Sequence, residues 1–371
     1  MSSSPSTARV AMLTQAQTFE PRDYPIPELG PGELLLKVEG CGICGTDVHE
    51  YKRDPFGLMP VVLGHEGTGT IVAMADETAV DFTGQPLTVG DPVVTSVLVP
   101  DDCPFTHDFP DRSNLSDGLG VYGLFPDSDS HHLNGFFATH MVVRAGSTVF
   151  KVDGMTVKQR MLIEPFAVTV HALQRAKTTG LLDFDSTILV QGCGPIGLMM
   201  VATLYAAGHG KIIAADSVDQ RLEMAKKMGA ADTLNITGVS PADATQTIRE
   251  TSRGRGVDFV FQCTGVPAAA AQALTYVRRG GGLCEVGFFM DNGTCSVNPH
   301  EDFCKKEITL VGSWVYTANE YPLAISLLHQ LDSIAIPAED LVTHTFPLSK
   351  IGEAFETNIA MDGIKIAVLP D

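Results

Sequence analysis

Three segments of the chain contain side chains that can bind a transition metal. They are CGICGTDVH (Cys41–His49), GHEGTG (Gly64–Gly69) and IEPFAVTVHA (Ile163–Ala172). Thiolate, imidazole and carboxylate ligands together suit Zn²⁺ with one coordination position open for water or substrate. Such a zinc ion polarises an alcohol and lowers its pKa, so that the alcohol can lose its proton near neutral pH. The candidate residues are Cys41, Cys44, His49, His65, Glu66 and Glu164.

Each of these residues taken alone has an ordinary structural explanation. A single cysteine such as Cys44 is most often a buried apolar side chain, and a single histidine such as His65 most often has its hydrogen bonds satisfied in a core. The metal-binding interpretation therefore depends on the whole set and on a second motif in the same chain.

That second motif is Gly192-Cys193-Gly194-Pro195-Ile196-Gly197, which has the form GxGxxG. It follows a β-rich apolar run at 187–191 and precedes an apolar helix expected at 196–207, which is the context of a dinucleotide-binding turn. The first glycine permits the tight turn, the second lets the backbone approach a pyrophosphate, and the third lets the helix pack on the sheet. The start of the helix offers free N–H groups to the phosphates.

Asp216 lies 19 residues beyond Gly197, at the end of the next expected strand. A carboxylate at this place accepts hydrogen bonds from the adenosine ribose and repels a 2′-phosphate, so the sequence predicts NAD rather than NADP. Arg221 weakens this prediction because a guanidinium can bind a 2′-phosphate. The alternative interpretation is purely structural. In that case the turn is a tight connection that binds no ligand, and Asp216 is an acid at the start of a helix.

The elements that must position these residues form two regions with different patterns of secondary structure. Up to about residue 155, strands expected at 33–39 and 67–72 alternate with turns rich in Pro and Gly, as in an all-β domain. After Glu164, strands at 187–191, 211–216, 257–262, 283–286 and 308–311 alternate with helices, which indicates a doubly wound parallel sheet of the α/β class. We expect a catalytic domain over 1–163, a dinucleotide-binding domain over 164–312, and a segment over 313–371 that returns to the catalytic domain.

Composition limits the partners and the compartment. The 371 residues carry 44 Asp and Glu against 25 Lys and Arg, a net charge of −19, which repels nucleic acid and anionic membranes. The first ten residues lack the features of a signal peptide, and no apolar run is long enough to span a membrane. Eight scattered cysteines are too few for a disulfide scaffold, so we expect reduced thiols and a cytoplasmic location.

Together these motifs resemble the zinc-containing medium-chain dehydrogenase/reductase family over nearly the whole chain. GICGTDVH, GHEGTG, VGDPVV (Val89–Val94), the Glu164-Pro165 segment and QGCGPIG stand in the family's order, and the Glu-Pro segment is most similar to the polyol branch. The resemblance implies a Rossmann domain beside a mainly-β, GroES-like catalytic domain. It implies that Cys44, His65 and Glu66 bind the catalytic zinc, and that Glu164 binds it directly or through its water.

The resemblance also assigns roles around the metal and the cofactor. Thr46 corresponds to the hydroxyl that contacts the alcohol oxygen, and His49 to the base that passes the proton to solvent. Phe288 and Trp314 are candidates for the wall of the nicotinamide pocket. The cofactor-binding residues expected in full are Gly192, Gly194, Pro195, Ile196, Gly197, Asp216, Arg221, Thr264, Val286, Gly287, Phe288, Ser313, Trp314 and Val315.

Two departures from the family pattern refine the expectation. The lobe at 99–117 contains only Cys103 where relatives often place four cysteines, so we expect one catalytic zinc per chain and no structural zinc. Sorbitol dehydrogenases have a Tyr after the relay His and a late Arg-Tyr pair. Here Glu50 and Val315-Tyr316 occupy these positions, which argues against sorbitol itself as the substrate.

The sequence therefore predicts a zinc-dependent enzyme that oxidises a small alcohol or polyol and transfers hydride to NAD. Two alternatives stay open: a zinc-free NAD(P)H quinone or enoyl reductase, and a non-catalytic NAD-binding module. The zinc-free relatives lack the Cys and His at these positions. The resemblance also implies a homodimer or homotetramer formed through the sheet edge near residues 283–298.

Overall fold

The computed structural model describes residues 6–99, 101–128 and 131–371. The chain divides into two compact units. One contains the chain up to Glu164 together with Thr317–Ile325 and Glu339–Asp371, and the other contains Pro165–Tyr316 and Ser326–Ala338. Two of the four points at which the chain passes from one unit to the other fall inside helices α3 (Val157–Lys177) and α8 (Glu320–Ser333).

The first unit is built mainly from antiparallel strands. Its largest sheet has the order β10-β6-β5-β3-β18-β17, and β9 also pairs with β3. Strand β18 runs antiparallel to β3, so the last strand of the chain lies beside one of the first. The strands of this sheet are β3 (Leu34–Gly42), β5 (Glu66–Met74), β6 (Pro92–Thr95), β9 (His140–Val143), β10 (Val149–Lys151), β17 (Val342–Pro347) and β18 (Lys365–Leu369).

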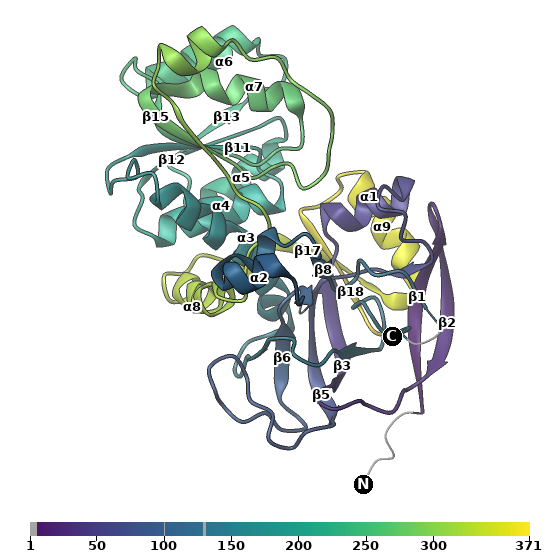
Figure 1. Ribbon diagram of the computed structural model, residues 1–371. Coiled ribbons are helices and arrows are strands. Elements are labelled where there is room, and N and C mark those ends of the chain that lie inside the picture. Colours follow the sequence, from purple (N-terminus) through teal and green to yellow (C-terminus); the bar gives the residue numbers. More distant parts are fainter. Residues whose placement is uncertain (1–5, 100, 129–130) are drawn as a thin grey trace. The chain divides into compact units, whose positions relative to one another are not determined.

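Smaller elements cover this sheet and complete the core of the first unit. Helices α1 and α9 meet through Tyr51 and Phe355, whose ring centroids are 4.8 Å apart, and Figure 1 shows the two helices side by side. The apolar residues of β3 face this core, including Leu36 and Val38. The remaining elements are β1 (Thr7–Gln15), β2 (Thr18–Pro25), α1 (Gly45–Arg53), β4 (Val61–Val62), β7 (Leu98–Val99), α2 (Pro104–Asp108), β8 (Gly120–Val121) and α9 (Ile351–Ile359).

The second unit contains a parallel sheet in the order β13-β12-β11-β14-β15-β16. Figure 1 shows α4 and α5 on one face of this sheet and α6 and α7 on the other, the arrangement of a doubly wound fold. Its elements are β11 (Thr187–Gln191), α4 (Pro195–Ala206), β12 (Lys211–Asp216), α5 (Asp219–Lys227), β13 (Asp232–Asn235), α6 (Pro241–Thr251), β14 (Val257–Gln262), α7 (Pro267–Tyr276), β15 (Val277–Glu285) and β16 (Thr309–Gly312).

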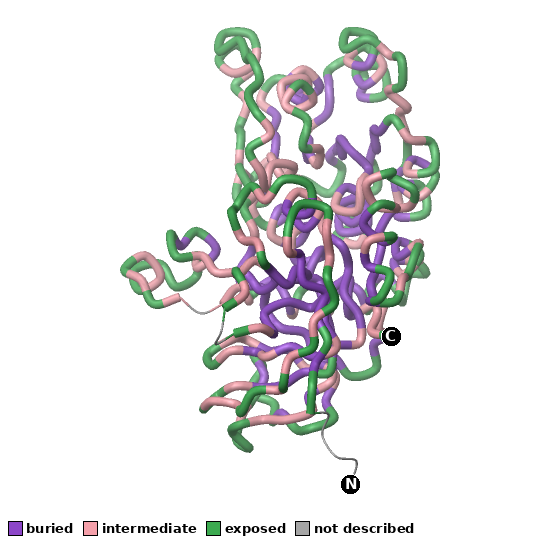
Figure 2. Tube along the Cα trace, turned by 90° about the vertical axis from the view of Figure 1, so that its right-hand side faces the viewer, coloured by how far each residue is buried: buried purple, intermediate pink, exposed green. Residues whose placement is uncertain are grey.

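Burial follows the pattern expected of each sheet type. The central strands β11 and β14 are buried along almost their whole length, because helices cover both faces of a parallel sheet. Figure 2 shows these buried stretches inside each unit, with exposed residues at the turns. The fold class predicted from the sequence, a Rossmann sheet with a mainly-β catalytic domain, is confirmed.

The two units differ from the expected domain bounds in how the returning segment is divided. Residues 313–316 and 326–338, which we had assigned to the returning segment, belong to the second unit. The reason is local: the N–H of Ser313 donates to the carbonyl of Glu285, and Gln330 on α8 donates to the carbonyl of Ala206. At this end of the sheet, β16 pairs with β15 and is the edge strand, and the oligomer interface expected near residues 283–298 stays a prediction.

The lobe after β7 is partly ordered into short helices. Helix α2 and the 3-10 helix η1 (Pro110–Leu115) occupy its middle. Cys103 precedes α2, and its Sγ lies 3.2 Å from the hydroxyl of Ser116. Each of the eight cysteines carries a free thiol. Within the described residues, no helix has the length and apolar character needed to span a membrane.

Candidate active site

The carboxylate of Asp47 ties together the two segments that carry the expected metal ligands. Cys44 lies directly before α1, and its N–H donates to Asp47 Oδ2 at 2.9 Å. The N–H of Gly64, next to His65, donates to Asp47 Oδ1 at 3.2 Å. Asp47 is fully buried. The start of α1 and the start of β5 are therefore held in one place by a single side chain.

His65 is buried between Asp47 and Cys44. Its Nδ1 lies 3.5 Å from Asp47 Oδ1 and has no hydrogen-bond partner among the described residues. Burial opposes the charged imidazolium, but Asp47 and then Cys44 outweigh it and raise the pKa of His65 well above its ordinary value. A carboxylate behind one ring nitrogen of a histidine is the usual arrangement when the other nitrogen binds a metal.

Glu66 begins β5 and makes a buried ion pair with Lys365. The Nζ of Lys365 donates to both carboxylate oxygens of Glu66 at 2.5 Å and to the carbonyl of Ile43 at 3.2 Å. Gly42 pairs with Glu66 across the sheet, and a Cβ at Gly42 would overlap the Glu66 carboxylate. The absence of a side chain at Gly42 therefore leaves the space that this ion pair occupies.

The groups that shift the pKa of Lys365 show which side chains lie around it. Burial works against the charged ammonium of Lys365, but Glu66, then Cys44, and also Glu164 raise its pKa above the ordinary value. Glu164 is buried in α3. The structure therefore brings Cys44, His65, Glu66 and Glu164 into one neighbourhood, with Lys365 among them.

Helix α1 presents the residues expected to handle the proton. The Sγ of Cys44 lies 3.7 Å from the hydroxyl of Thr46, which is buried. His49 stands three residues further on, on the same side of the helix as Thr46. Burial, followed by Arg53 and Lys52, lowers the pKa of His49, and Arg53 Nη2 lies 3.4 Å from its Nδ1. The lowered pKa favours the neutral imidazole, which is the form that can accept a proton.

The donor set fits a zinc ion, although its members are not drawn around a common centre. Among the described residues, no group of three or more His, Cys, Asp or Glu side chains is close enough together to enclose a metal. The Glu66 carboxylate instead points to Lys365. Thiol and imidazole lie side by side, the buried Nδ1 of His65 faces Asp47, and carboxylates stand nearby, which is the donor chemistry of an open zinc site.

In the second unit, the expected cofactor residues gather at one edge of the parallel sheet. They follow the carboxyl ends of five strands. The chain runs from β11 outward to β13 in one direction and from β14 outward to β16 in the other, so the ends of β11 and β14 form the switch point where the dinucleotide crevice of such a sheet is expected. By strand, they are Gly192–Gly197 after β11, Asp216 and Arg221 from β12 into α5, Thr264 after β14, Val286–Phe288 after β15 and Ser313–Val315 after β16.

The glycine turn has the expected geometry. Gly192 has φ +92°, which favours glycine, and a Cβ at Gly197 would overlap the carbonyl oxygen of Gly192. A Cβ at Gly194 would meet open space, which leaves room for a ligand to approach the backbone. Asp216 Oδ2 accepts the N–H of Cys193 at 2.6 Å, and Oδ1 accepts the N–H of Val218. The Asp216 carboxylate therefore braces the turn and retains lone pairs for ribose hydroxyls.

Trp314 has an aromatic neighbour that the sequence did not indicate. Trp314 stacks on Phe289, with ring centroids 4.9 Å apart and ring planes 11° from parallel. The sequence had suggested Phe288 and Trp314 as the aromatic wall. The structure adds Phe289 as the stacking partner of Trp314, and the role of Phe288 and Trp314 beside the nicotinamide stays a prediction.

Comparison with known proteins agrees with this geometry. The family model for the alcohol dehydrogenase GroES-like domain matches residues 30–154, and the model for zinc-binding dehydrogenases matches residues 195–330. Sorbitol dehydrogenase of Bacillus subtilis (strain 168) is 32% identical over 376 residues, covering 99% of this chain and 98% of the relative. The chain belongs to the zinc-containing medium-chain dehydrogenase/reductase family. Within it, the similarity places the chain in the polyol dehydrogenase branch.

Solved structures of family members have the same fold. Alcohol dehydrogenase of Thermotoga maritima superposes with a TM-score of 0.91 at 25% identity, covering 98% of this chain and 100% of that one. The 2R,3R-butanediol dehydrogenase of Bacillus subtilis superposes with a TM-score of 0.81 at 28% identity, covering 98% and 100%. The family resemblance expected from the motifs is therefore confirmed.

Within this family site, sequence reasoning missed three side chains. Asp47 had a recognisable signal, since an acid at the third position of a helix commonly accepts the N–H of the residue before the helix. Lys365 was visible only as a charged residue at the start of an apolar strand. Glu285 ends β15 beside the cofactor crevice, where burial raises its pKa to about 7.

Proposed function

We propose that this chain is a zinc-dependent dehydrogenase that oxidises a polyol or a related small alcohol and transfers hydride to NAD. The observation that carries the proposal is the pairing of Cys44 with His65 behind the buried Asp47 carboxylate. The relatives named sorbitol dehydrogenase and butanediol dehydrogenase support a substrate with more than one hydroxyl.

In this proposal, separate residues bind the metal, position its ligands and transfer the proton. Cys44 and His65 would hold the zinc, with Glu66 or Glu164 as the carboxylate ligand. When bound, zinc acts as a Lewis acid toward the alcohol oxygen, and NAD accepts the hydride. Asp47 holds His65 in place, and the Thr46 hydroxyl is placed to hydrogen-bond the substrate oxygen. His49, whose lowered pKa favours the neutral imidazole, accepts the proton and releases it to solvent.

Metal analysis beside activity tests this proposal. Purified protein is expected to contain about one zinc per chain and to reduce NAD in the presence of a polyol. Cys44→Ser should lose both properties. Cys103→Ser, in the lobe, is the matched control and should keep both. Two zinc ions per chain would show that the lobe binds a second metal, and a zinc-free active protein would favour the reductase alternative.

NAD preference rests on Asp216, whose carboxylate lies at the end of β12 beside the glycine turn. Asp216→Ser should weaken NAD binding and improve relative use of NADP, because it removes both a ribose acceptor and a charge that repels the 2′-phosphate. Asp219→Ser, three residues later on α5, is the control. A wild-type enzyme faster with NADP than with NAD would overturn the assignment and direct attention to Arg221.

A panel of substrates, followed by NADH absorbance, addresses specificity. Glu50 stands where sorbitol dehydrogenases have a substrate-facing Tyr, and it is buried here, with Oε1 accepting the N–H of Phe56 at 3.1 Å. The Glu50 side chain is therefore held by a hydrogen bond inside the protein and does not take the substrate-facing role of that Tyr. We expect short diols and smaller polyols to be better substrates than sorbitol.

A further inference from the structure

The second unit contains a cavity of about 730 Å³ at the amino ends of β14 and β15. Asp258 near the start of β14 and Val277 at the start of β15 line it. The cofactor residues follow the opposite, carboxyl ends of the same two strands. Because the strands are parallel, this cavity lies at the other edge of the sheet from the dinucleotide crevice and is separate from it.

The cavity is strongly cationic in a strongly acidic protein. The chain has a net charge of −19 and only 25 Lys and Arg. Six of these line this one cavity, against the carboxylates of Asp258, Glu301 and Asp302. The six cationic residues are Arg249, Arg255, Arg278, Arg279, Lys305 and Lys306.

The carboxylates leave much of this charge unpaired. Arg278 Nε donates to Asp258 Oδ1 at 2.5 Å, and Lys305 Nζ lies 3.0 Å from Glu301 Oε2. Asp302 is engaged otherwise, because its Oδ2 accepts the backbone N–H of Asn298 at 2.7 Å.

Three of the guanidinium groups make no close ion pair among the described residues, although Asp258 acts on Arg255 and Glu301 on Arg279 at longer range. The side chains of Arg249, Arg255 and Arg279 make no ion pair or hydrogen bond with any part of the chain that the structure describes. Lys306 donates to the carbonyl of Leu274, and burial followed by the charge of Arg249 lowers its pKa. Six cationic residues therefore face three carboxylates in this cavity, and the positive charge is only partly compensated.

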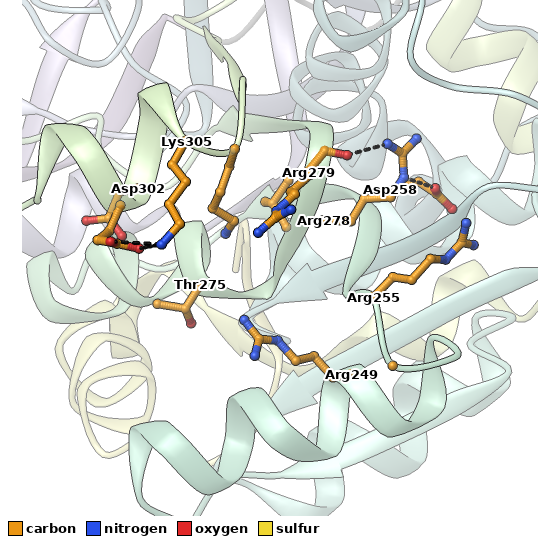
Figure 3. Close-up of a pocket in the computed structure, with 12 residues that line it drawn as sticks. Arg249, Arg255, Asp258, Thr275, Arg278, Arg279, Asp302 and Lys305 are labelled. Carbon is orange, nitrogen blue, oxygen red and sulfur yellow. Dashed lines mark hydrogen bonds and ion pairs between the residues drawn. The ribbon is translucent and has the colours of Figure 1, made fainter.

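The cationic groups come from separate elements and converge. Arg249 is on α6, Arg255 on the connection to β14, and Arg279 on β15. Lys305 follows the π-helical segment η2 (Pro299–Cys304). Figure 3 shows Arg249, Arg279 and Lys305 directed toward a common space, with Arg255 on the side of Asp258. Such a fork of guanidinium groups matches the oxygens of phosphate groups.

A second hollow of about 570 Å³ continues from the first and shares Arg249, Thr275 and Asp302 with it. Its other walls include Pro241, Ala242 and Ala271, which are small and mainly apolar, and the amide of Gln272. We propose that the two hollows form a binding site for a nucleoside polyphosphate, with phosphates on the arginines and the base against the Pro241–Ala242 wall. The site is distinct from the dinucleotide crevice.

Binding of ATP to the full-length, zinc-loaded protein tests this, with NADH at saturating concentration to fill the dinucleotide crevice. Titration calorimetry is expected to show about one ATP per chain, with affinity that falls as salt is raised. Inorganic tripolyphosphate should compete but bind about ten-fold more weakly than ATP, because it lacks the base. Orthophosphate should not compete at the same concentrations.

The double variant Arg249→Ala/Arg279→Ala should weaken ATP binding by roughly 10- to 100-fold, as expected for two lost charged hydrogen bonds. Lys227→Ala, an exposed site on α5, removes one positive charge outside the cavity and should change nothing. The conservative Arg249→Lys/Arg279→Lys variant should restore part of the affinity. Unchanged NAD-dependent turnover in each variant shows that the protein is folded.

Several results would overturn the proposal. They are absence of saturable ATP binding when NADH is present, and equal ATP affinity in the double alanine variant and the wild type. Equal affinity for tripolyphosphate and ATP would remove the base from the second hollow. Binding of RNA or heparin without any binding of ATP would assign the cavity to a macromolecular polyanion instead.

Discussion

Replacement of Glu50 by Gln should stabilise the protein above neutral pH. Glu50 is fully buried on α1, and its Oε2 has no hydrogen-bond partner among the described residues. Burial, and to a lesser degree Asp54 and Asp47, raise its pKa from 4.5 to about 7, against the N–H of Phe56, which lowers it. Gln keeps the shape of the protonated acid and carries no charge at any pH.

The size and direction of the effect follow from this difference in pKa. A carboxyl whose pKa is raised by folding holds its proton more tightly in the folded chain. Its contribution is therefore present below pH 4.5 and is lost as the pH rises through about 7. The ionised wild type should be less stable than Glu50→Gln by about 3 kcal/mol at pH 8 and by roughly 1 kcal/mol at pH 5.

Urea unfolding of the wild type and of Glu50→Gln at a series of pH values measures the difference in their free energies of unfolding. The other titrating groups are the same in both proteins, so their effects cancel in this difference. Glu77→Gln, at an exposed position, is the matched control and should differ from wild type by less than about 0.5 kcal/mol throughout. Infrared spectra should show a protonated carboxyl at pH 6 that Glu50→Gln lacks. A stability difference that does not change between pH 5 and pH 8 would refute the assignment of a raised pKa to Glu50.

Three further outcomes concern the site. His49→Gln should lower turnover near pH 7 by roughly 10- to 100-fold and by less at high pH, where hydroxide replaces the base; pH–rate profiles identical to wild type would remove His49 from the proton path. Lys365→Met should destabilise the zinc-free protein by about 3 kcal/mol, because it leaves the buried Glu66 carboxylate alone; thermal melts beside an exposed control, Lys350→Met, measure this, and equal melting would contradict the ion pair. Chelation should abolish turnover without changing the far-ultraviolet circular dichroism, whereas unfolding on chelation would indicate a structural metal.

The parallel-sheet domain was the most predictable part of the molecule. The strands predicted at 187–191, 211–216 and 257–262 match β11, β12 and β14 residue for residue. Strands buried on both faces are continuous apolar runs, which are visible without knowing what packs on them. Helix α6 was missed although Ser240, Pro241 and Asp243 provide a complete helix start, with Ser240 accepting the N–H of Asp243.

The candidate site was predictable only where its chemistry is local. Cys44, Thr46 and His49 lie within one turn and the following helix, and the family resemblance carried by that short segment assigned them a shared role. The contact between Glu66 and Lys365 joins residues 299 apart in sequence and depends on the register of β18 against β3. Nothing near either residue encodes that register, so this pair required the structure.

The position of β18 also sets an order of assembly during synthesis. The main sheet of the first unit has β3 and β5 on one side of β18 and β17 on the other. The ribosome makes β3 and β5 early, and it makes β18 only after all the strands of the second unit. The side of β3 that later pairs with β18 therefore has no partner strand while the second unit is being translated. Such an edge is open to wrong pairing, and β3 is apolar along most of its length. Chaperone demand during translation should therefore come mainly from the first unit, and premature stop codons even a few residues before Lys365 should remove the ammonium beside the metal ligands together with the strand that completes the sheet.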